Sequence, residues 1–303
     1  MRMEYYGKIL LFGEHVVVQG APALAVPLRR YGGVWRFLAD MDTESTTYQS
    51  SIRAWFDYLL QEQQQGNLGV ALDFERLADD LDRGLYFEST IPVGYGAGSS
   101  GALCAALYDT YAIHPIGRED TSSYAIIRGI LGRMESFFHG ASSGADPIVS
   151  YLNRPLLFDR DKSVRAVAPP AANPTYRLFL LNTGHARRTG PLVEAFQAWC
   201  RQPEYLSRVL TELIPVTEDA IYAYLGGQWE LLYEAWESIS HFQYRYMQEM
   251  ILPEWRSVWL EGLAKKAHCL KICGAGGGGF ILGLSRNWDA TVAEFGSLAA
   301  TLD

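Results

Sequence analysis

Residues 92–100 read PVGYGAGSS, and this stretch decides how the first half of the chain folds. The extended residues 84–92 precede it and the Ala- and Leu-rich residues 101–113 follow it, which predicts a strand, a glycine loop and a helix. The first N–H groups of a helix have no partner within it and carry a positive partial charge, so such a loop can cradle phosphate. A glycine turn before a helix is as often purely structural, so a functional assignment needs supporting residues elsewhere.

Small residues fill this loop and let a phosphate approach the backbone closely. The residues that we expect to bind nucleotide phosphates are Gly94, Gly96, Ala97, Gly98, Ser99 and Ser100. The hydroxyl of Ser100, in the first turn of the helix, is also expected to reach a magnesium ion that bridges the phosphates. The loop is not a Walker A motif, because no lysine precedes its serines.

Two carboxylates stand eleven residues apart in the segment from Glu135 to Asp146, ESFFHGASSGAD. A helix is predicted over residues 122–138, and the small residues after it exclude a continuous helix, so the two acids can converge on one pocket. Phosphoryl transfer needs one carboxylate to hold magnesium and another to orient or deprotonate the attacking hydroxyl. We assign the first role to Glu135 and the second to Asp146. The alternative is a solvated helix end and a helix cap.

A lysine interrupts the first apolar segment of the chain. Lys8 stands between Gly7 and the apolar residues 9–12, which predict a short buried strand. A partly buried lysine generally has an anionic partner. Asp146 and a substrate phosphate are the candidate partners, and Lys8 is therefore a second candidate catalytic residue.

Glu14 and His15 follow that strand directly, after Gly13. They either contact the substrate or fix the turn, and the sequence favours neither role. His139 is interpreted as a hydrogen-bonded loop residue, because Asp146 already fills the role of the base.

A second glycine-rich loop, residues 274–279, reads GAGGGG between two apolar segments. One or two glycines suffice for a hairpin turn, and every further glycine costs backbone entropy when the loop is ordered. Close approach to a ligand or to another loop explains five glycines better. Gly276 and Gly277 are therefore candidates for substrate binding.

The composition excludes several classes of function. The chain has 303 residues, four cysteines and a formal net charge of -8, which argues against an extended surface for nucleic acid. The cysteine spacing indicates neither a disulfide framework nor a zinc site, and Cys269 and Cys273 are interpreted as core residues. The first apolar run is too short for a signal peptide or a membrane span. We therefore expect a cytoplasmic protein that acts on a small molecule without binding a membrane, and a homodimer is compatible with the sequence.

The most linker-like stretch is APPAANP at residues 168–174, which has three prolines and no apolar periodicity. We place a domain boundary there, between residues 1–170 and residues 171–303. The other elements that the apolar pattern predicts are a hairpin from residues 7–12 and 21–28, helices at 51–64, 191–201, 217–225 and 229–250, and strands at 176–181 and on both sides of the second glycine loop, within 270–284.

Three motifs together resemble those of the GHMP kinase superfamily, which includes galactokinase, homoserine kinase, mevalonate kinase and phosphomevalonate kinase. They are GKILLFGEH at residues 7–15, PVGYGAGSS at 92–100 and KICGAGGGG at 271–279, in the family's order and spanning nearly the whole chain. Within the superfamily the chain is most similar to mevalonate kinases, through the first motif and the spacing of Glu135, His139 and Asp146. RRTGPLV at residues 187–193 is also similar to a mevalonate kinase segment, which would put Thr189 near the substrate; a helix N-cap is an equal alternative.

This resemblance implies an α+β fold of two domains. The N-terminal domain would be like ribosomal protein S5 domain 2 and the C-terminal domain ferredoxin-like, with ATP in the cleft between them. The resemblance also implies that Lys8 and Asp146 are catalytic, that Ser100 and Glu135 bind Mg²⁺, and that an alcohol is phosphorylated. Mevalonate would become 5-phosphomevalonate, an isoprenoid precursor.

Two other functions are compatible with the motifs. One is a GHMP kinase for another acceptor, phosphomevalonate or a sugar, and the other is a nucleotide-binding protein without activity. Retention of Lys8, Glu135 and Asp146 together argues against the inactive protein. The chain departs from the mevalonate kinase pattern in having Ser142 in place of a proline and Pro147 in place of an asparagine, and also at Tyr95 and Ala97. These departures leave the phosphate chemistry intact and bear on the acceptor.

Overall fold

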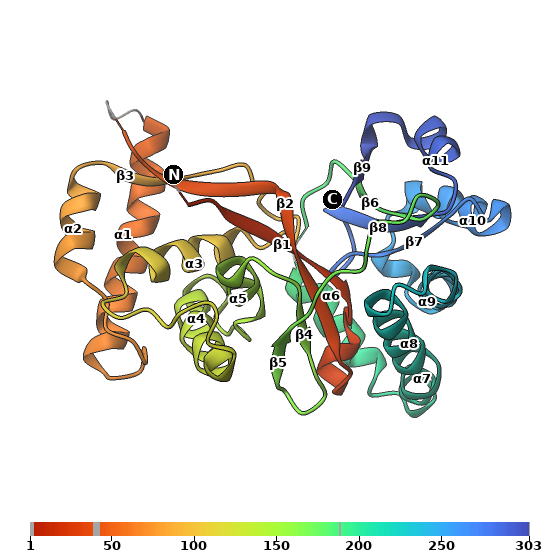
Figure 1. Cartoon of the computed structure of the whole chain (residues 1–303), viewed down its shortest axis with the longest axis horizontal. Helices are drawn as coiled ribbons and strands as arrows, with labels where there is room; N and C mark the ends of the chain where they lie inside the picture. The colour runs from red at the N-terminus through yellow and green to blue at the C-terminus, as the bar shows by residue number, and fades with distance from the viewer. Residues whose placement is uncertain (1–2, 39–42, 188, 303) are drawn as a thin grey trace. The chain divides into compact units, whose positions relative to one another are not determined.

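The computed structural model describes residues 3–38, 43–187 and 189–302 (Figure 1). The chain forms two compact units: unit 1 comprises residues 1–8, 27–92 and 98–154, and unit 2 comprises residues 9–26, 93–97 and 155–303. The chain therefore enters each unit more than once, which a single boundary at residue 170 does not describe. As a division into the domains of the family, residues 1–170 and 171–303 stay a prediction.

Unit 1 contains the helices that surround the first glycine loop. They are α1 (Thr43–Gln64), α2 (Phe74–Asp82), α3 (Ser99–Tyr111), α4 (Tyr124–His139) and α5 (Ala145–Leu152). Helix α3 packs against α4 and α5, and most of its residues are buried because its middle consists of small and apolar side chains. The helices predicted over residues 101–113 and 122–138 are thus confirmed as α3 and α4, within two residues at each end.

The chain also forms a five-stranded sheet. Its strands are β1 (Tyr5–Phe12), β2 (Ala23–Phe37), β3 (Leu85–Ser89), β4 (Leu156–Phe158) and β5 (Val164–Ala166). The strand order is β1-β2-β4-β5, and β3 pairs antiparallel with the second half of β2. Strands β1 and β2 are neighbours, as the predicted hairpin requires, and β1 lies at one end of the order.

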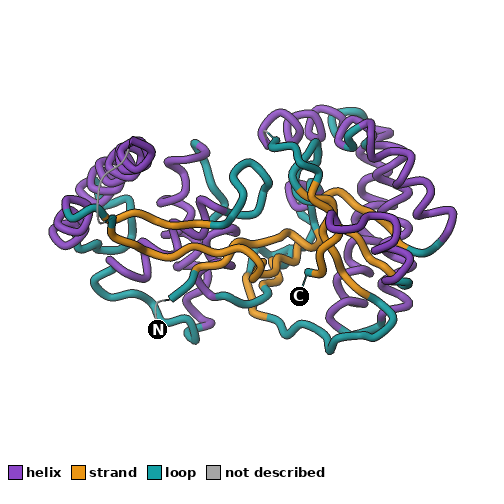
Figure 2. Tube along the Cα trace, turned by 90° about the horizontal axis from the view of Figure 1, so that it is seen from above, coloured by secondary structure: helices purple, strands orange, loops and turns teal. Residues whose placement is uncertain are grey.

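Unit 2 is built on an antiparallel sheet with the strand order β7-β8-β6-β9. These strands are β6 (Arg177–Asn182), β7 (His268–Ile272), β8 (Phe280–Ser285) and β9 (Ala299–Thr301). Its helices are α6 (Thr189–Trp199), α7 (Pro203–Arg208), α8 (Ile214–Leu225), α9 (Trp229–Tyr246), α10 (Arg256–Lys265) and α11 (Trp288–Phe295). Figure 2 shows these helices alongside the strands, and α9 and α10 pack against β7. The second glycine loop connects β7 to β8, as predicted.

One expectation about composition is also met. Cys269 and Cys273 are buried, in keeping with their interpretation as core residues. Within the described ranges, the helices are too short or too polar to span a membrane.

Candidate active site

Lys8 and Asp146 form an ion pair in unit 1, with 2.9 Å between Nζ and Oδ2. The Lys8 side chain is 11% exposed and the Asp146 side chain 37% exposed, so the carboxylate is open to a ligand. The predicted pairing is therefore present. The lysine is not buried by a central strand, because β1 ends the strand order. Its side chain instead packs on Gly98, where an added Cβ would lie 2.9 Å from the lysine Cγ.

Two close backbone approaches fix the position of Asp146. Helix α4 ends at His139, and Gly144 takes a left-handed conformation (φ 71°) as the N-cap of α5, which puts Asp146 in the first turn of α5. A Cβ on Gly144 would overlap the carbonyl oxygen of Arg128 in α4, and one on Gly101 in α3 would lie 2.9 Å from the backbone of Asp146. These glycines let three helices meet at the carboxylate.

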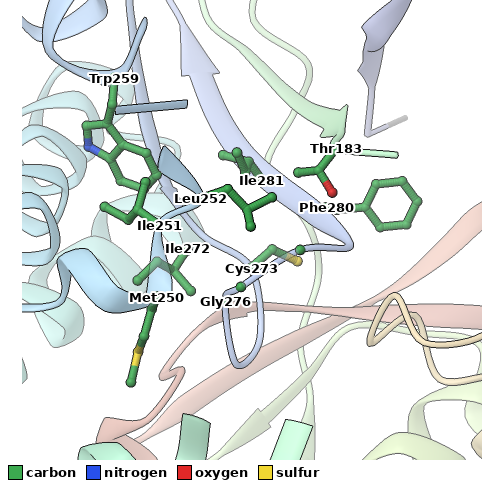
Figure 3. Close-up of a pocket in the computed structure, with 12 residues that line it drawn as sticks. Thr183, Met250, Ile251, Leu252, Trp259, Ile272, Cys273, Gly276, Phe280 and Ile281 are labelled. Carbon is green, nitrogen blue, oxygen red and sulfur yellow. The ribbon is translucent and has the colours of Figure 1, made fainter. Parts of the chain in front are cut away.

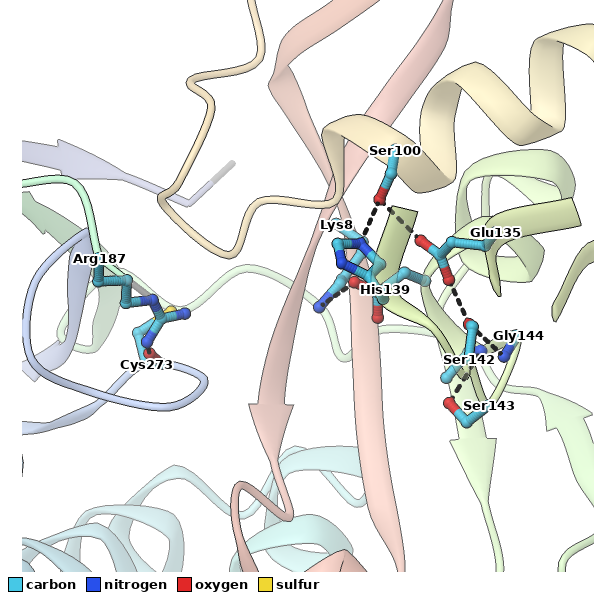
Figure 4. Close-up of polar contacts among 11 residues, drawn as sticks. Lys8, Ser100, Glu135, His139, Ser142, Ser143, Gly144, Arg187 and Cys273 are labelled. Atoms are coloured by element: carbon cyan, nitrogen blue, oxygen red, sulfur yellow. Dashed lines mark hydrogen bonds and ion pairs between the residues drawn. The ribbon is translucent and has the colours of Figure 1, made fainter. Parts of the chain in front are cut away.

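Ser100 and Glu135, the predicted magnesium ligands, lie together in unit 1 (Figure 4). The Ser100 hydroxyl donates to Glu135 Oε1 at 2.9 Å and lies 3.0 Å from His139 Nε2. Ser142 donates to the other carboxylate oxygen of Glu135 and accepts the Gly144 backbone N–H at 3.0 Å. Ser142 is a departure from the mevalonate kinase pattern, and it supplies a hydroxyl that orients Glu135.

The electrostatic surroundings of Glu135 favour a cation. Burial raises the pKa of the Glu135 carboxyl from 4.5 to about 7, and the negative charge of Asp146 adds to this, against the opposing effects of Ser142, Ser100 and Lys8. A cation beside the carboxylate would relieve both causes, because it compensates lost solvation and separates two negative charges. Among the described residues no group of three or more His, Cys, Asp or Glu side chains is placed to hold a metal. One carboxylate and one hydroxyl nevertheless suit Mg²⁺, which proteins hold with few ligands plus water and substrate phosphates.

The first glycine loop ends at the N-terminus of α3. Gly98 is the N-cap of that helix, with φ 77°, and Ser99 and Ser100 form its first turn. Gly94 and Gly96 also have left-handed backbone angles, with φ of 80° and 70°. Residues 94–97 belong to unit 2 and residues 98–100 to unit 1. The part in unit 1 presents the first backbone N–H groups of a buried 13-residue helix, the arrangement that suits an anion.

Arg187 joins the two glycine-rich loops within unit 2. Its backbone N–H donates to the Gly94 carbonyl at 2.9 Å, and its Nη1 donates to the carbonyls of Cys273 and Gly276 at 2.8 and 3.1 Å. A Cβ on Gly96 or Gly274 would overlap the guanidinium group. Close approach to another part of the protein therefore explains glycine at these two positions.

Gly276 and Gly277 also face protein atoms. An added Cβ at Gly276 would lie 2.7 Å from the Met250 carbonyl oxygen, and one at Gly277 would lie 2.7 Å from Leu192 Cδ1. A cavity of about 10 Å³ borders the loop (Figure 3), and that size admits no more than a water molecule. Packing thus accounts for both glycines, and their role in substrate binding stays a prediction.

The turn that carries Glu14 and His15 is held by two side-chain contacts in unit 2. Glu14 accepts a hydrogen bond from Lys271, and His15 Nε2 lies 3.2 Å from the Ala275 carbonyl oxygen. Because a carbonyl only accepts, Nε2 is the protonated nitrogen of the ring. Of the two roles left open by the sequence, fixing the turn is therefore present in the structure, and substrate contact stays a prediction.

His15 presents an unused acceptor. Burial lowers the pKa of its imidazole from 6.5 to about 4, so the ring is neutral near pH 7. Its Nδ1 is buried without a hydrogen-bond partner among the described residues. A buried polar atom of this kind is costly unless a ligand or water satisfies it.

Thr189 begins α6, and its side chain lies outside the described residues.

Sequence reasoning missed Lys271. It is an isolated lysine in the buried strand β7, the same signal that singled out Lys8. Ser142 had no such signal, because a serine in a polar turn is common.

Comparisons with known proteins show what the whole chain is similar to. Residues 67–154 match the GHMP kinases N terminal domain. The mevalonate kinase of Methanothermobacter thermautotrophicus is 27% identical over 95% of this chain and 95% of that protein, and the mevalonate kinase of Thermococcus gammatolerans is 28% identical over 94% and 89%. The crystal structure of L. major mevalonate kinase in complex with R-mevalonate superimposes with a TM-score of 0.67 at 17% identity, over 99% of this chain and 94% of that one.

The chain is therefore a kinase with the two-domain α+β fold of the GHMP kinases, a phosphotransferase whose acceptor is an alcohol group. This confirms the resemblance drawn from the three sequence motifs. The curated relatives named above are mevalonate kinases.

Proposed function

We propose that this kinase transfers the γ-phosphoryl group of ATP to the 5-hydroxyl of mevalonate, with Mg²⁺ as the metal. The observation that carries the proposal is the ion pair between Lys8 and Asp146, whose carboxylate is partly exposed and lies in the same unit as the start of α3. The names of the relatives support mevalonate as the acceptor. A cytoplasmic location and a homodimer remain predictions.

Asp146 receives the acceptor hydroxyl in this proposal. Its carboxylate orients the attacking oxygen and takes its proton as the bond to phosphorus forms. Lys8 fixes the direction of the carboxylate through the 2.9 Å ion pair and adds positive charge where the transferred group gains negative charge. Since phosphoryl transfer depends mainly on positioning and charge, these two residues supply most of what the protein must contribute.

The phosphates and the metal are assigned to residues of the first glycine loop and to Glu135. Gly94, Gly96, Ala97, Gly98, Ser99 and Ser100 are the proposed phosphate-binding residues. Ser100 and Glu135 would hold Mg²⁺, because their oxygens already lie 2.9 Å apart. When bound, Mg²⁺ neutralises charge on the phosphate oxygens.

The acceptor-binding candidates are Glu14, His15, Thr189, Gly276 and Gly277. His15 has the most specific support, because its buried Nδ1 is an acceptor that a substrate hydroxyl would satisfy. Mevalonate is a hydroxy acid with such a hydroxyl in addition to the one that is phosphorylated.

The acceptor is tested by measuring ADP release with mevalonate, phosphomevalonate, galactose and homoserine in parallel. Turnover with mevalonate at least about tenfold above the others is expected, since each unmet polar group costs that much or more. The Asp146→Asn variant serves as the control for ATP hydrolysis without transfer. If the enzyme phosphorylates only phosphomevalonate or only a sugar, that compound is the acceptor and mevalonate is not.

Glu135→Gln is expected to stabilise the folded protein and to lower its turnover. The pKa of Glu135 is raised from 4.5 to about 7 in the folded protein, so the folded state binds this proton more tightly than the unfolded chain. Ionising Glu135 therefore costs stability as the pH rises through this range, and the variant should gain about 1 kcal/mol or more near pH 8, a gain that shrinks toward about pH 5. Turnover should fall at least about tenfold, because a metal ligand is lost.

Urea unfolding at both pH values and steady-state kinetics check this prediction. Glu261→Gln is the control, since Glu261 is an exposed residue on α10 that pairs with Lys265. A variant as active as the parent would remove Glu135 from the magnesium site. If the difference in the free energy of unfolding between the variant and the parent were the same at both pH values, the electrostatic argument would be contradicted.

A further inference from the structure

Lys271 is a fully buried cation outside the residues assigned so far. It lies in β7, every residue of which is buried, and its side chain is 1% exposed. A buried ammonium group is stable only when anions, carbonyls or aromatic faces replace its water. Its presence in an apolar strand therefore requires compensation from the surrounding residues.

The surroundings of Lys271 supply that compensation. Its Nζ donates to the carboxylate of Glu14, whose side chain is 4% exposed, and to the Ile272 carbonyl at 3.1 Å. The rings of Phe12 and Trp236 lie 5.7 and 5.5 Å from Nζ, within range of a cation–π interaction. All of these residues belong to unit 2.

The loop that follows β7 contacts the turn after β1 at a second point. Ala275, four residues after Lys271, accepts from His15 Nε2 at 3.2 Å. The turn is tight, because Gly13 has φ 99° and a Cβ there would lie 2.7 Å from the Cα of Ala23. Glu14 and His15 are adjacent, so the ion pair to Lys271 limits how far the His15 ring can move.

The local charge also depends on Lys271. Lys271 and Arg187 both act electrostatically on His15, and Glu14 is paired with Lys271. With two cations and one carboxylate, the charge around His15 is positive on balance, which favours an anionic acceptor such as a hydroxy acid. Without Lys271 the carboxylate of Glu14 would repel such an acceptor.

We propose that Lys271 is a positioning residue for the phosphate acceptor, an inference that rests on the proposed function. Its ion pair with Glu14 holds the turn at residues 13–15, so that His15 Nδ1 stays available to a hydroxyl of an anionic hydroxy acid. It also cancels a buried negative charge that would oppose the binding of that acid. Lys271 sets the KM for the acceptor and leaves the phosphoryl transfer step unchanged.

The test compares four full-length variants by steady-state kinetics with mevalonate. Lys271→Met should raise the KM for mevalonate at least about tenfold and change kcat and the KM for ATP less than about threefold, the pattern of lost substrate binding. Lys271→Arg keeps the charge and should have a lower KM than Lys271→Met. Lys265→Met, at an exposed lysine of α10, is the matched control and should behave like the parent.

The fourth variant keeps the test decisive if Lys271→Met folds poorly. Glu14→Gln combined with Lys271→Met leaves no unpaired buried charge, so it should regain thermal stability and should not repel the acceptor. Its KM should nevertheless stay above that of the parent, because the ion pair that holds the turn is lost. A parental KM in this folded double variant, or a fall in kcat at unchanged KM, would overturn the inference. Failure of the parent enzyme to phosphorylate mevalonate would instead contradict the proposed function, and the two failures are distinct.

Discussion

The Asp146→Asn variant is expected to lose about 100- to 10,000-fold in kcat and to keep its affinity for ATP. Asparagine has nearly the shape of aspartate, but it accepts no proton and carries no charge to pair with Lys8. The carboxylate is partly exposed, so the change removes the reactive group with little effect on packing. The loss should therefore appear in the chemical step.

Single-turnover kinetics measure the chemical step, and ATP titration by calorimetry measures the affinity for ATP. Asp159→Asn is the matched control, because it also breaks an ion pair, that of Asp159 with Arg165 at 2.8 Å, and neither residue is assigned to the proposed site. A kcat within about tenfold of the parent would exclude Asp146 as the catalytic carboxylate. Loss of ATP binding would indicate a role in nucleotide affinity instead.

The second large effect is expected at Gly144. Substitution by alanine would force a Cβ onto the carbonyl oxygen of Arg128 and would put alanine at φ 71°. The left-handed conformation costs roughly 1–2 kcal/mol and the overlap adds roughly 1–3 kcal/mol, so we expect a loss of about 3 kcal/mol in the free energy of unfolding. The turn must shift to relieve the overlap, and it carries Asp146, so kcat should fall about 100-fold.

Gly20 provides a matched control. It has a similar left-handed conformation, φ 83° and ψ 13°, and an added Cβ there would meet no heavy atom within 4 Å. Gly20→Ala should therefore cost only about 1 kcal/mol and leave kcat within about threefold of the parent. Urea unfolding and kinetics on both variants check the pair of predictions. Equal losses at Gly20 and Gly144 would show that backbone strain, rather than the contact with α4, governs the effect at Gly144.

Much of the fold was predictable because the buried elements have strong local patterns. Helix α3 is rich in alanine and leucine, and the second glycine loop lies between two apolar strands. Strand β2 was harder, since residues 29–37 include three arginines and two glycines. The structure shows that this half of the strand is only partly buried, so no continuous apolar run marks it. Strands β4 and β5 have three residues each, too few to show alternation.

The candidate site was predictable where a buried charged residue requires a partner of opposite charge. A lysine in an apolar strand requires an anion, and this led to the pairing of Lys8 with Asp146. The contacts of Ser142 and Arg187 were not predictable, because they depend on how turns approach one another rather than on residue type. The interleaving of the two units is likewise a property of long-range contacts, and no local composition change marks residues 9–26 as part of unit 2.

That interleaving has a consequence for how the protein is made. Residues 9–26 emerge from the ribosome early, but their partners in unit 2 begin at residue 155 apart from the short segment 93–97. Synthesis of the roughly 130 intervening residues takes roughly 6–26 s at about 5–20 residues per second. During that time Phe12, which packs against Tyr224 and Trp236 in the finished fold, lacks both of these partners. The nascent chain, rather than the folded enzyme, is thus the form most in need of a chaperone.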